Sequence, residues 1–184
     1  SAETIAYLED IVKEPAHLIG WSDGGNIALM VAIQRPDLVR SIVAIGANYH
    51  YNHGGDPTPE SPISDEDRAE YAMQSPDAPE TLDLKVARMQ GIWNSEPTLT
   101  VDDLAKVQCP ALILAGDDEL FSIEHTSSMY EAIPQGQLAI IPGTSHYVLK
   151  EKPELTQAVI KQFLSDLSAP ITRAPVRRQN PKLF

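Results

Sequence analysis

Cysteine, positive charge and long apolar runs are all scarce in this sequence of 184 residues. The single cysteine, Cys109, cannot form an internal disulfide, so a reducing cytoplasm is the expected compartment. The 14 Lys and Arg are outnumbered by 26 Asp and Glu, which gives a formal net charge of −12. This balance argues against nucleic acid and against anionic membranes as partners, because both attract positive charge. No apolar run is long enough to span a bilayer, and the first residues do not resemble a secretion signal.

Short apolar segments alternate with amphipathic ones along most of the chain. Four segments read as buried strands: 16–20, 41–46, 111–116 and 137–141. Four others have apolar residues at helical spacing: 2–13, 26–34, 123–133 and 152–167. Strands that are apolar on both faces and alternate with helices are typical of a parallel sheet. We therefore predict an α/β fold, a mostly parallel sheet flanked by helices, with its core in residues 1–46 and 108–168.

The interval 47–107 interrupts this alternation. It begins with clustered Pro and Gly and continues as acidic, helix-forming sequence. Residues 80–94 place Leu82, Val86, Met89 and Trp93 on one helical face, and 65–74 form a weaker helix. We interpret the interval as a helical lid inserted over the strand ends, with a surface excursion that plays no part in binding as the alternative. The Pro- and Arg-rich residues 169–184 are predicted to be extended or disordered.

The sequence Gly20-Trp21-Ser22-Asp23-Gly24 joins the first apolar segment to a helix. A strand that turns directly into a helix holds its central residue in a strained conformation and exposes the side chain. Side chains two positions away would collide, so we expect glycine to be required at both 20 and 24. Ser22 is the candidate nucleophile, and the backbone N–H of Asp23 is a candidate oxyanion donor. The alternative is a glycine-rich turn with an incidental serine.

A serine nucleophile needs a base, and the base needs an acid to orient it. His146 follows the fourth predicted strand and should lie at the same sheet edge as Ser22. We expect His17 to be structural, while His50 and His53 fall in the insertion and His125 in the first turn of a helix. The third predicted strand ends in Gly116-Asp117-Asp118-Glu119, which supplies candidate acids. The order is then nucleophile, acid and histidine.

Together these segments resemble the α/β-hydrolase superfamily, in particular its lid-bearing esterases, epoxide hydrolases and related enzymes. The resemblance is carried by HLIGWSDGGNIAL, CPALILAGDDELF and IPQGQLAIIPGTSH. It implies that Glu119, three residues after Gly116, is the acid, with Asp118 as the alternative. A serine at the elbow implies acyl transfer on a small ester-like substrate, or C–C cleavage, without metal or cofactor. Trp21 and Trp93 are the candidate substrate-binding residues.

The chain departs from the family pattern at its start. The family places several strands and half of the oxyanion hole ahead of the nucleophile, whereas here one helix precedes it. Strand 16–20 should therefore be an exposed apolar edge. We expect the second half of a longer enzyme, ahead of a homodimer through 16–20 or an impaired descendant that acts by association. The triplet 53–55, His-Gly-Gly, resembles an oxyanion loop by coincidence. A nucleotide-binding domain ranks last, because G-W-S-D-G-G is not G-x-G-x-x-G.

Overall fold

Four parallel strands form the sheet of this protein. The computed structural model describes residues 1–52 and 62–175 and orders the strands β1-β2-β3-β4, with every neighbouring pair parallel. The strands are β1 (Ala16–Trp21), β2 (Val39–Ile45), β3 (Ala111–Asp118) and β4 (Gly136–Ser145). The predicted parallel α/β sheet is confirmed. β4 is longer than predicted, because its pairing with β3 continues to Asp118 and Ser145, so His146 follows it directly.

Helices connect and cover the strands. They are α1 (Ala2–Tyr7), α2 (Asp23–Gln34), α3 (Asp65–Gln74), α4 (Leu82–Trp93), α5 (Val101–Leu104), α6 (Ile123–Ala132), α7 (Val148–Glu151) and α8 (Pro153–Ser165). The first predicted helix changes into a π-helical turn from Leu8 to Val12. The last predicted helix begins at Pro153, because proline suits the first position of a helix but lacks the N–H needed inside one.

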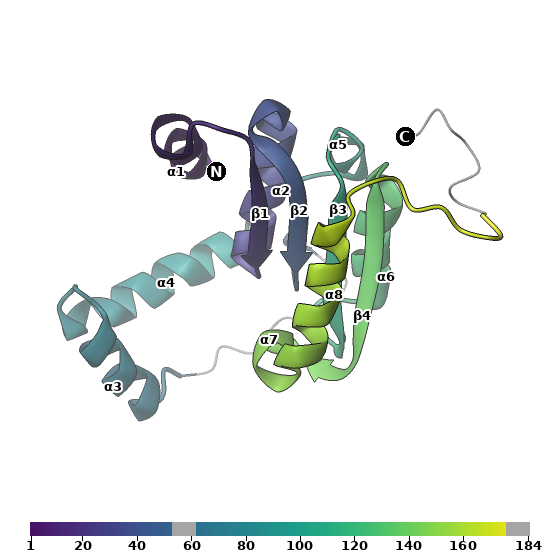
Figure 1. Cartoon of the computed structure of the whole chain (residues 1–184). Helices are drawn as coiled ribbons and strands as arrows, with labels where there is room; N and C mark the ends of the chain where they lie inside the picture. The colour runs from purple at the N-terminus through teal and green to yellow at the C-terminus, as the bar shows by residue number, and fades with distance from the viewer. Residues whose placement is uncertain (53–61, 176–184) are drawn as a thin grey trace.

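The two faces of the sheet carry separate apolar clusters. On one face Ile42 and Ile113 pack with residues of α2, α5 and α6, and α1 adds partly buried residues. On the other face Val43 and Leu112 pack with Phe163 of α8. Figure 1 shows α8 on the side of the sheet opposite α2 and α6. Each large aliphatic side chain buried in this way stabilises the fold by roughly 1.5–3 kcal/mol, so β2 and β3 form the rigid centre.

β1 lies at the edge of the sheet and is half covered. Within the described residues it pairs with β2 alone. Its side chains alternate between intermediate and exposed, and Ile19 is 54% exposed. This is the exposed apolar edge that the sequence predicts.

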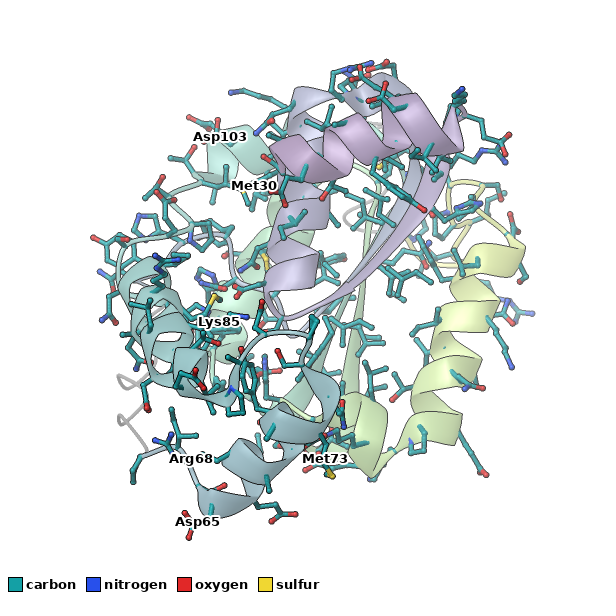
Figure 2. The ribbon with its side chains drawn as sticks, turned by 90° about the vertical axis from the view of Figure 1, so that its left-hand side faces the viewer. Met30, Asp65, Arg68, Met73, Lys85 and Asp103 are labelled. Atoms are coloured by element: carbon teal, nitrogen blue, oxygen red, sulfur yellow. The ribbon has the colours of Figure 1, made fainter. Side chains whose placement is uncertain are left out.

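Residues 65–94, called the arm below, project from the body of the protein (Figure 1). None of the residues of α3 and α4 is buried. Arg68 donates to Asp83 at 2.7 Å, and Lys85 forms an ion pair with Asp77. Figure 2 labels Arg68 and Lys85 on the arm. Polar contacts between its own segments therefore hold the arm together.

Both ends of the predicted insertion 47–107 are packed into the body. Ala47, Leu104 and Val107 belong to the core cluster around α2. An antiparallel bridge joins His50 to Thr98, so the two ends run side by side. The lid role of the arm stays a prediction.

The tail is described only as far as Pro175, and 169–175 contain neither helix nor strand. No helix of the described ranges has the length and apolarity to cross a bilayer.

Candidate active site

Ser22 occupies a sharp turn between β1 and α2. Its backbone has φ 54° and ψ −124°, which is a strained conformation for any residue with a side chain. Ser22 N–H donates to Ile45 O at 2.8 Å, and Ser22 O accepts from Gly25 N–H at 2.9 Å. The hydroxyl does not cap the helix that it precedes. The turn thus has the backbone of the predicted elbow.

The steric demand for glycine falls on different positions from those predicted. A Cβ at residue 20 would lie 2.1 Å from the carbonyl oxygen of Gly24, so Gly20 is required. A Cβ at residue 24 would meet no described atom within 4 Å. A Cβ at residue 25 would lie 2.8 Å from Ala47 Cβ. The prediction was right for Gly20 and wrong for Gly24, because the tight helix–strand approach occurs at Gly25.

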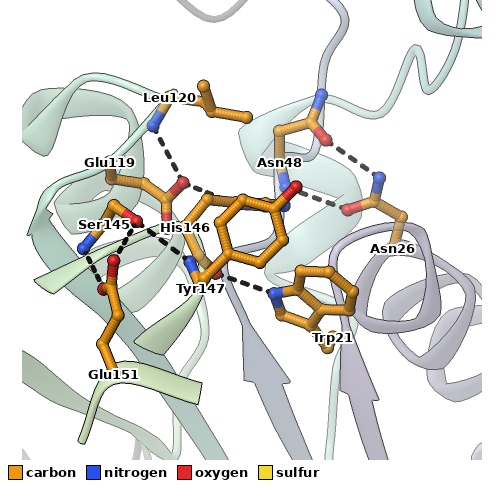
Figure 3. A network of polar contacts seen from close by, with 9 residues as sticks. All are labelled: Trp21, Asn26, Asn48, Glu119, Leu120, Ser145, His146, Tyr147 and Glu151. Atoms are coloured by element: carbon orange, nitrogen blue, oxygen red, sulfur yellow. Dashed lines mark hydrogen bonds and ion pairs between the residues drawn. The ribbon is translucent and has the colours of Figure 1, made fainter. Parts of the chain in front are cut away.

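His146 and Glu119 form a buried pair at the carboxyl edge of the sheet. The distance from His146 Nδ1 to Glu119 Oε1 is 2.6 Å, and their side chains are 11% and 2% exposed. Leu120 N–H also donates to Glu119 Oε1, at 2.8 Å (Figure 3). Asp118, in contrast, is exposed and ends β3. The structure thus brings Glu119, and not Asp118, to the imidazole.

Gly46 provides the space that this pair needs. A Cβ on Gly46 would lie 2.9 Å from His146 Nδ1 and 3.0 Å from Glu119 Oε2, and its φ is +53°. Glu119 Oε2 is buried without a hydrogen-bond partner among the residues described. This role was not predicted from the sequence, although a glycine ending the second predicted strand was a usable signal.

Acidic side chains also hold the loop that carries His146. Thr144 N–H donates to Asp117 Oδ1 at 3.1 Å, and this bond is the main cause of the lowered pKa of Asp117. Ser145 N–H donates to Glu151 Oε2 at 2.7 Å, and Ser145 Oγ contacts Glu151 Oε1 at 2.9 Å. The backbone immediately before His146 is therefore fixed from β3 and from α7.

Each of the two tryptophans donates a hydrogen bond at or beside the elbow. Trp21 Nε1–H donates to the carbonyl oxygen of His146 at 2.8 Å (Figure 3). Trp93 Nε1–H donates to Asp23 Oδ2 at 2.8 Å and so connects the end of α4 to the residue after Ser22. Their predicted role in substrate binding stays a prediction.

A pair of buried asparagines, not predicted from the sequence, fixes the start of α2. Asn26 Nδ2–H donates to Asn48 Oδ1, and Asn48 N–H donates back to Asn26 Oδ1, both at 2.9 Å. Asn26 Nδ2–H also contacts Asp23 Oδ1 at 3.3 Å. An amide within an otherwise apolar helix was the available signal. Both carboxylate oxygens of Asp23 thus accept hydrogen bonds.

Other histidines have other partners. His17 Nδ1 lies 2.7 Å from Ser41 Oγ. His125 is buried, stacks on the ring of Tyr49 and accepts from Tyr49 N–H at 3.2 Å. The triplet 53–55 lies outside the described residues. Within 1–52 and 62–175, no group of three or more His, Cys, Asp or Glu side chains could hold a metal ion.

One hollow of about 400 Å³ lies on the arm, apart from the residues above. It is lined by Asp67, Glu70, Tyr71, Gln74, Ser75 and Leu82. No candidate catalytic residue contributes to its wall.

Comparisons of this chain with a family model and with known proteins all point to the same family. The model of the Alpha/beta hydrolase family matches residues 2–158. A Haemophilus influenzae protein named as an esterase/lipase is 22% identical over 187 residues, covering 89% of this chain and 65% of its own length. A Caulobacter protein named as the carbamate hydrolase RutD is 26% identical and is covered over 72% of its length. The chain thus spans about two thirds of the length of these curated relatives.

Solved structures show the same fold. A serine hydrolase involved in carbazole degradation has a TM-score of 0.68 at 24% identity, covering 89% of this chain and 70% of its own. A meta-cleavage product hydrolase from Pseudomonas fluorescens has a TM-score of 0.64 at 17% identity, covering 88% of this chain and 69% of its own.

Proposed function

The chain belongs to the alpha/beta hydrolase family, and on that premise we propose that it is a serine hydrolase that cleaves an ester or related acyl bond. Ser22 is the nucleophile, His146 the general base and Glu119 the acid that orients it. The observation that carries the proposal is the 2.6 Å contact between His146 Nδ1 and Glu119 Oε1, buried at the sheet edge where the strained Ser22 lies. The names of the curated relatives, esterase/lipase and carbamate hydrolase, agree with this class of reaction.

The chemistry follows from these roles. His146 Nε2 takes the proton of Ser22 Oγ while Oγ attacks the acyl carbon, and the carbonyl oxygen becomes an oxyanion. The N–H of Asp23 begins α2 and has no acceptor inside the helix, so it can donate to that oxyanion. His146 then returns the proton to the leaving group as the acyl bond breaks, and a water molecule releases the acyl group from Ser22 by the reverse sequence. Glu119 stabilises the imidazolium that forms in each half.

Labelling with a fluorophosphonate probe tests the proposal. The probe phosphorylates an activated serine, so the wild-type protein should be labelled and Ser22→Ala should not. Ser128→Ala is the matched control, because this serine lies in α6 and its hydroxyl donates to a backbone carbonyl. Labelling that persists in Ser22→Ala, or is absent from the wild type, would contradict the proposal.

A second candidate is association through β1. Its support is the edge position of β1 and the 54% exposure of Ile19, because an unpaired apolar edge can pair with another strand. On this proposal two copies form a homodimer. Sedimentation velocity at micromolar concentration should show a dimer that Ile19→Lys dissociates; a wild type that sediments as a monomer would contradict it.

A further inference from the structure

Trp21 makes contacts that a substrate-binding side chain does not need. Its indole N–H donates to the backbone carbonyl oxygen of His146, 125 residues away, at 2.8 Å. Its ring centroid lies 5.2 Å from that of His146 at an interplanar angle of 39°, and 5.6 Å from that of Tyr147 at 48°. Figure 3 shows the indole N–H directed at the loop that carries His146. The contact therefore fixes the backbone of the candidate base.

We propose that Trp21 is a positioning residue for His146, an inference that rests on the serine hydrolase function proposed above. Trp21 is the last residue of β1 and is followed directly by Ser22. Its indole thus ties the strand that carries the nucleophile to the backbone of the base. In this way one side chain sets the distance between the backbones of Ser22 and His146, whose side chains exchange the proton.

The other contacts of the loop cannot replace this one. Within the loop that carries His146, Glu119 bonds the imidazole and no backbone group, so it orients the ring without fixing the backbone beneath it. Asp117 and Glu151 hold Thr144 and Ser145, from β3 and α7. Of these side chains, only that of Trp21 comes from the nucleophile side of the site. Loss of its N–H should let His146 move relative to Ser22, and misplacement by about 1 Å can cost on the order of 100-fold in rate.

Trp21→Phe is the direct test, because it keeps an aromatic ring and removes the N–H. We expect kcat for a p-nitrophenyl ester, and the rate of fluorophosphonate labelling, to fall about 10- to 100-fold. KM should stay within about twofold, since uniform loss of substrate binding would raise KM instead. Ile19→Ala is the matched control, because Ile19 lies two residues earlier on the same face of β1 and is exposed.

A second measurement does not depend on turnover. The proton shared by His146 Nδ1 and Glu119 should give a resonance far downfield in the proton NMR spectrum, because their separation is 2.6 Å. In Trp21→Phe this resonance should broaden or disappear while circular dichroism remains that of the wild type. Trp21→Tyr, which also lacks the indole N–H, should behave in the same way if the phenylalanine variant does not fold.

The outcomes separate this inference from the proposed function. A wild type that is not labelled contradicts the serine hydrolase, while the NMR comparison still decides the role of Trp21. A labelled wild type with an equally reactive Trp21→Phe, or a variant that raises KM alone, overturns the positioning role. An equal loss in Ile19→Ala also overturns it, because the cause would then be β1 as a whole.

Discussion

The carboxyl edge of the sheet and the arm (65–94) use opposite kinds of contact. At the edge, side chains from distant parts of the chain meet: the buried His146 and Glu119 bond each other, and Trp21, 39% exposed, bonds the backbone carbonyl of His146. On the arm, Arg68 and Lys85 pair with carboxylates 15 and 8 residues away, and the helices bury no residue.

This difference implies different responses to mutation. Exposed ion pairs contribute roughly 0–1 kcal/mol each, so the arm can lose one without consequence for the sheet. The buried contacts of the edge depend on the core beneath them, and a change there alters geometry and stability together.

The largest contrast concerns two neighbouring carboxylates at the edge. Glu119→Gln should lower kcat/KM by about 10⁴, as loss of the orienting acid does in serine hydrolases. Asp118→Asn should leave activity within about twofold, because Asp118 is exposed. Steady-state kinetics on a p-nitrophenyl ester measures both. The reverse result would make Asp118 the acid and would mean that the buried contact between His146 and Glu119 plays no part in catalysis.

The elbow glycines give the next contrast. Gly20→Ala should destabilise the protein by at least about 4 kcal/mol, because the new Cβ would overlap the backbone of Gly24. Gly24→Ala meets no described atom and should be neutral or stabilising by about 0.5–1 kcal/mol. Urea denaturation gives both free energies of unfolding. Equal losses would mean that the elbow requires glycine on both sides after all.

Two leucines compare the core with the arm directly. Leu104 is fully buried and Leu84 is 56% exposed. Leu104→Ala should cost about 2–5 kcal/mol and Leu84→Ala at most about 0.5 kcal/mol. The measurement is again urea denaturation. A large loss for Leu84→Ala would show that the arm contributes to the cooperative core.

Alkaline pH should act in opposite directions on the core and on the arm. Burial beside the core cluster raises the pKa of Cys109 to about 11 from 9.0. Folding therefore favours the neutral thiol, and its contribution to stability, about 2–3 kcal/mol, is lost as pH rises from 9 to 11. On the arm, the hydrogen bond to Lys85 is the main cause of the lowered pKa of Tyr71, so its phenolate favours folding as pH rises.

The difference between wild type and Cys109→Ala isolates the thiol. Thermal unfolding from pH 8 to 11 should show a steeper loss of stability in the wild type, and Tyr71→Phe should steepen the loss further. Parallel curves for the wild type and Cys109→Ala would contradict the buried thiol.

The local sequence pattern predicted those features of the site that depend on the order of strands and turns along the backbone. Apolar strands and a glycine-framed serine indicated the elbow, and strand order placed His146 and the acids at one edge. The choice of Glu119 needed the family spacing, because three consecutive acids look alike in sequence. The structure distinguishes them by burial: Glu119 follows the strand end and turns inward, while Asp118 stays exposed.

The features of the site that could not be predicted from the sequence depend on contacts between segments that are far apart along the chain. Gly46 matters because two side chains pack over its Cα, and Gly25 because Ala47 approaches it. Asn26 and Asn48 pair across 22 residues, which no local periodicity encodes. The indole of Trp21 bonds a backbone carbonyl, which every residue type carries. The identity of the acceptor residue therefore gives no sign of this bond in the sequence, and only the fold reveals it.

The bridge between His50 and Thr98 closes the insertion at its base. Tyr51 N–H donates to Pro97 O, and Leu99 N–H donates to Tyr49 O, on either side of the bridge. For the sheet, everything between these residues is one closed loop, and the entropic cost of such a loop grows only with the logarithm of its length. The segment can thus be shortened, lengthened or exchanged for another without redirecting β2 or β3. The fold therefore permits this segment to diversify independently of the strands that position Ser22 and His146.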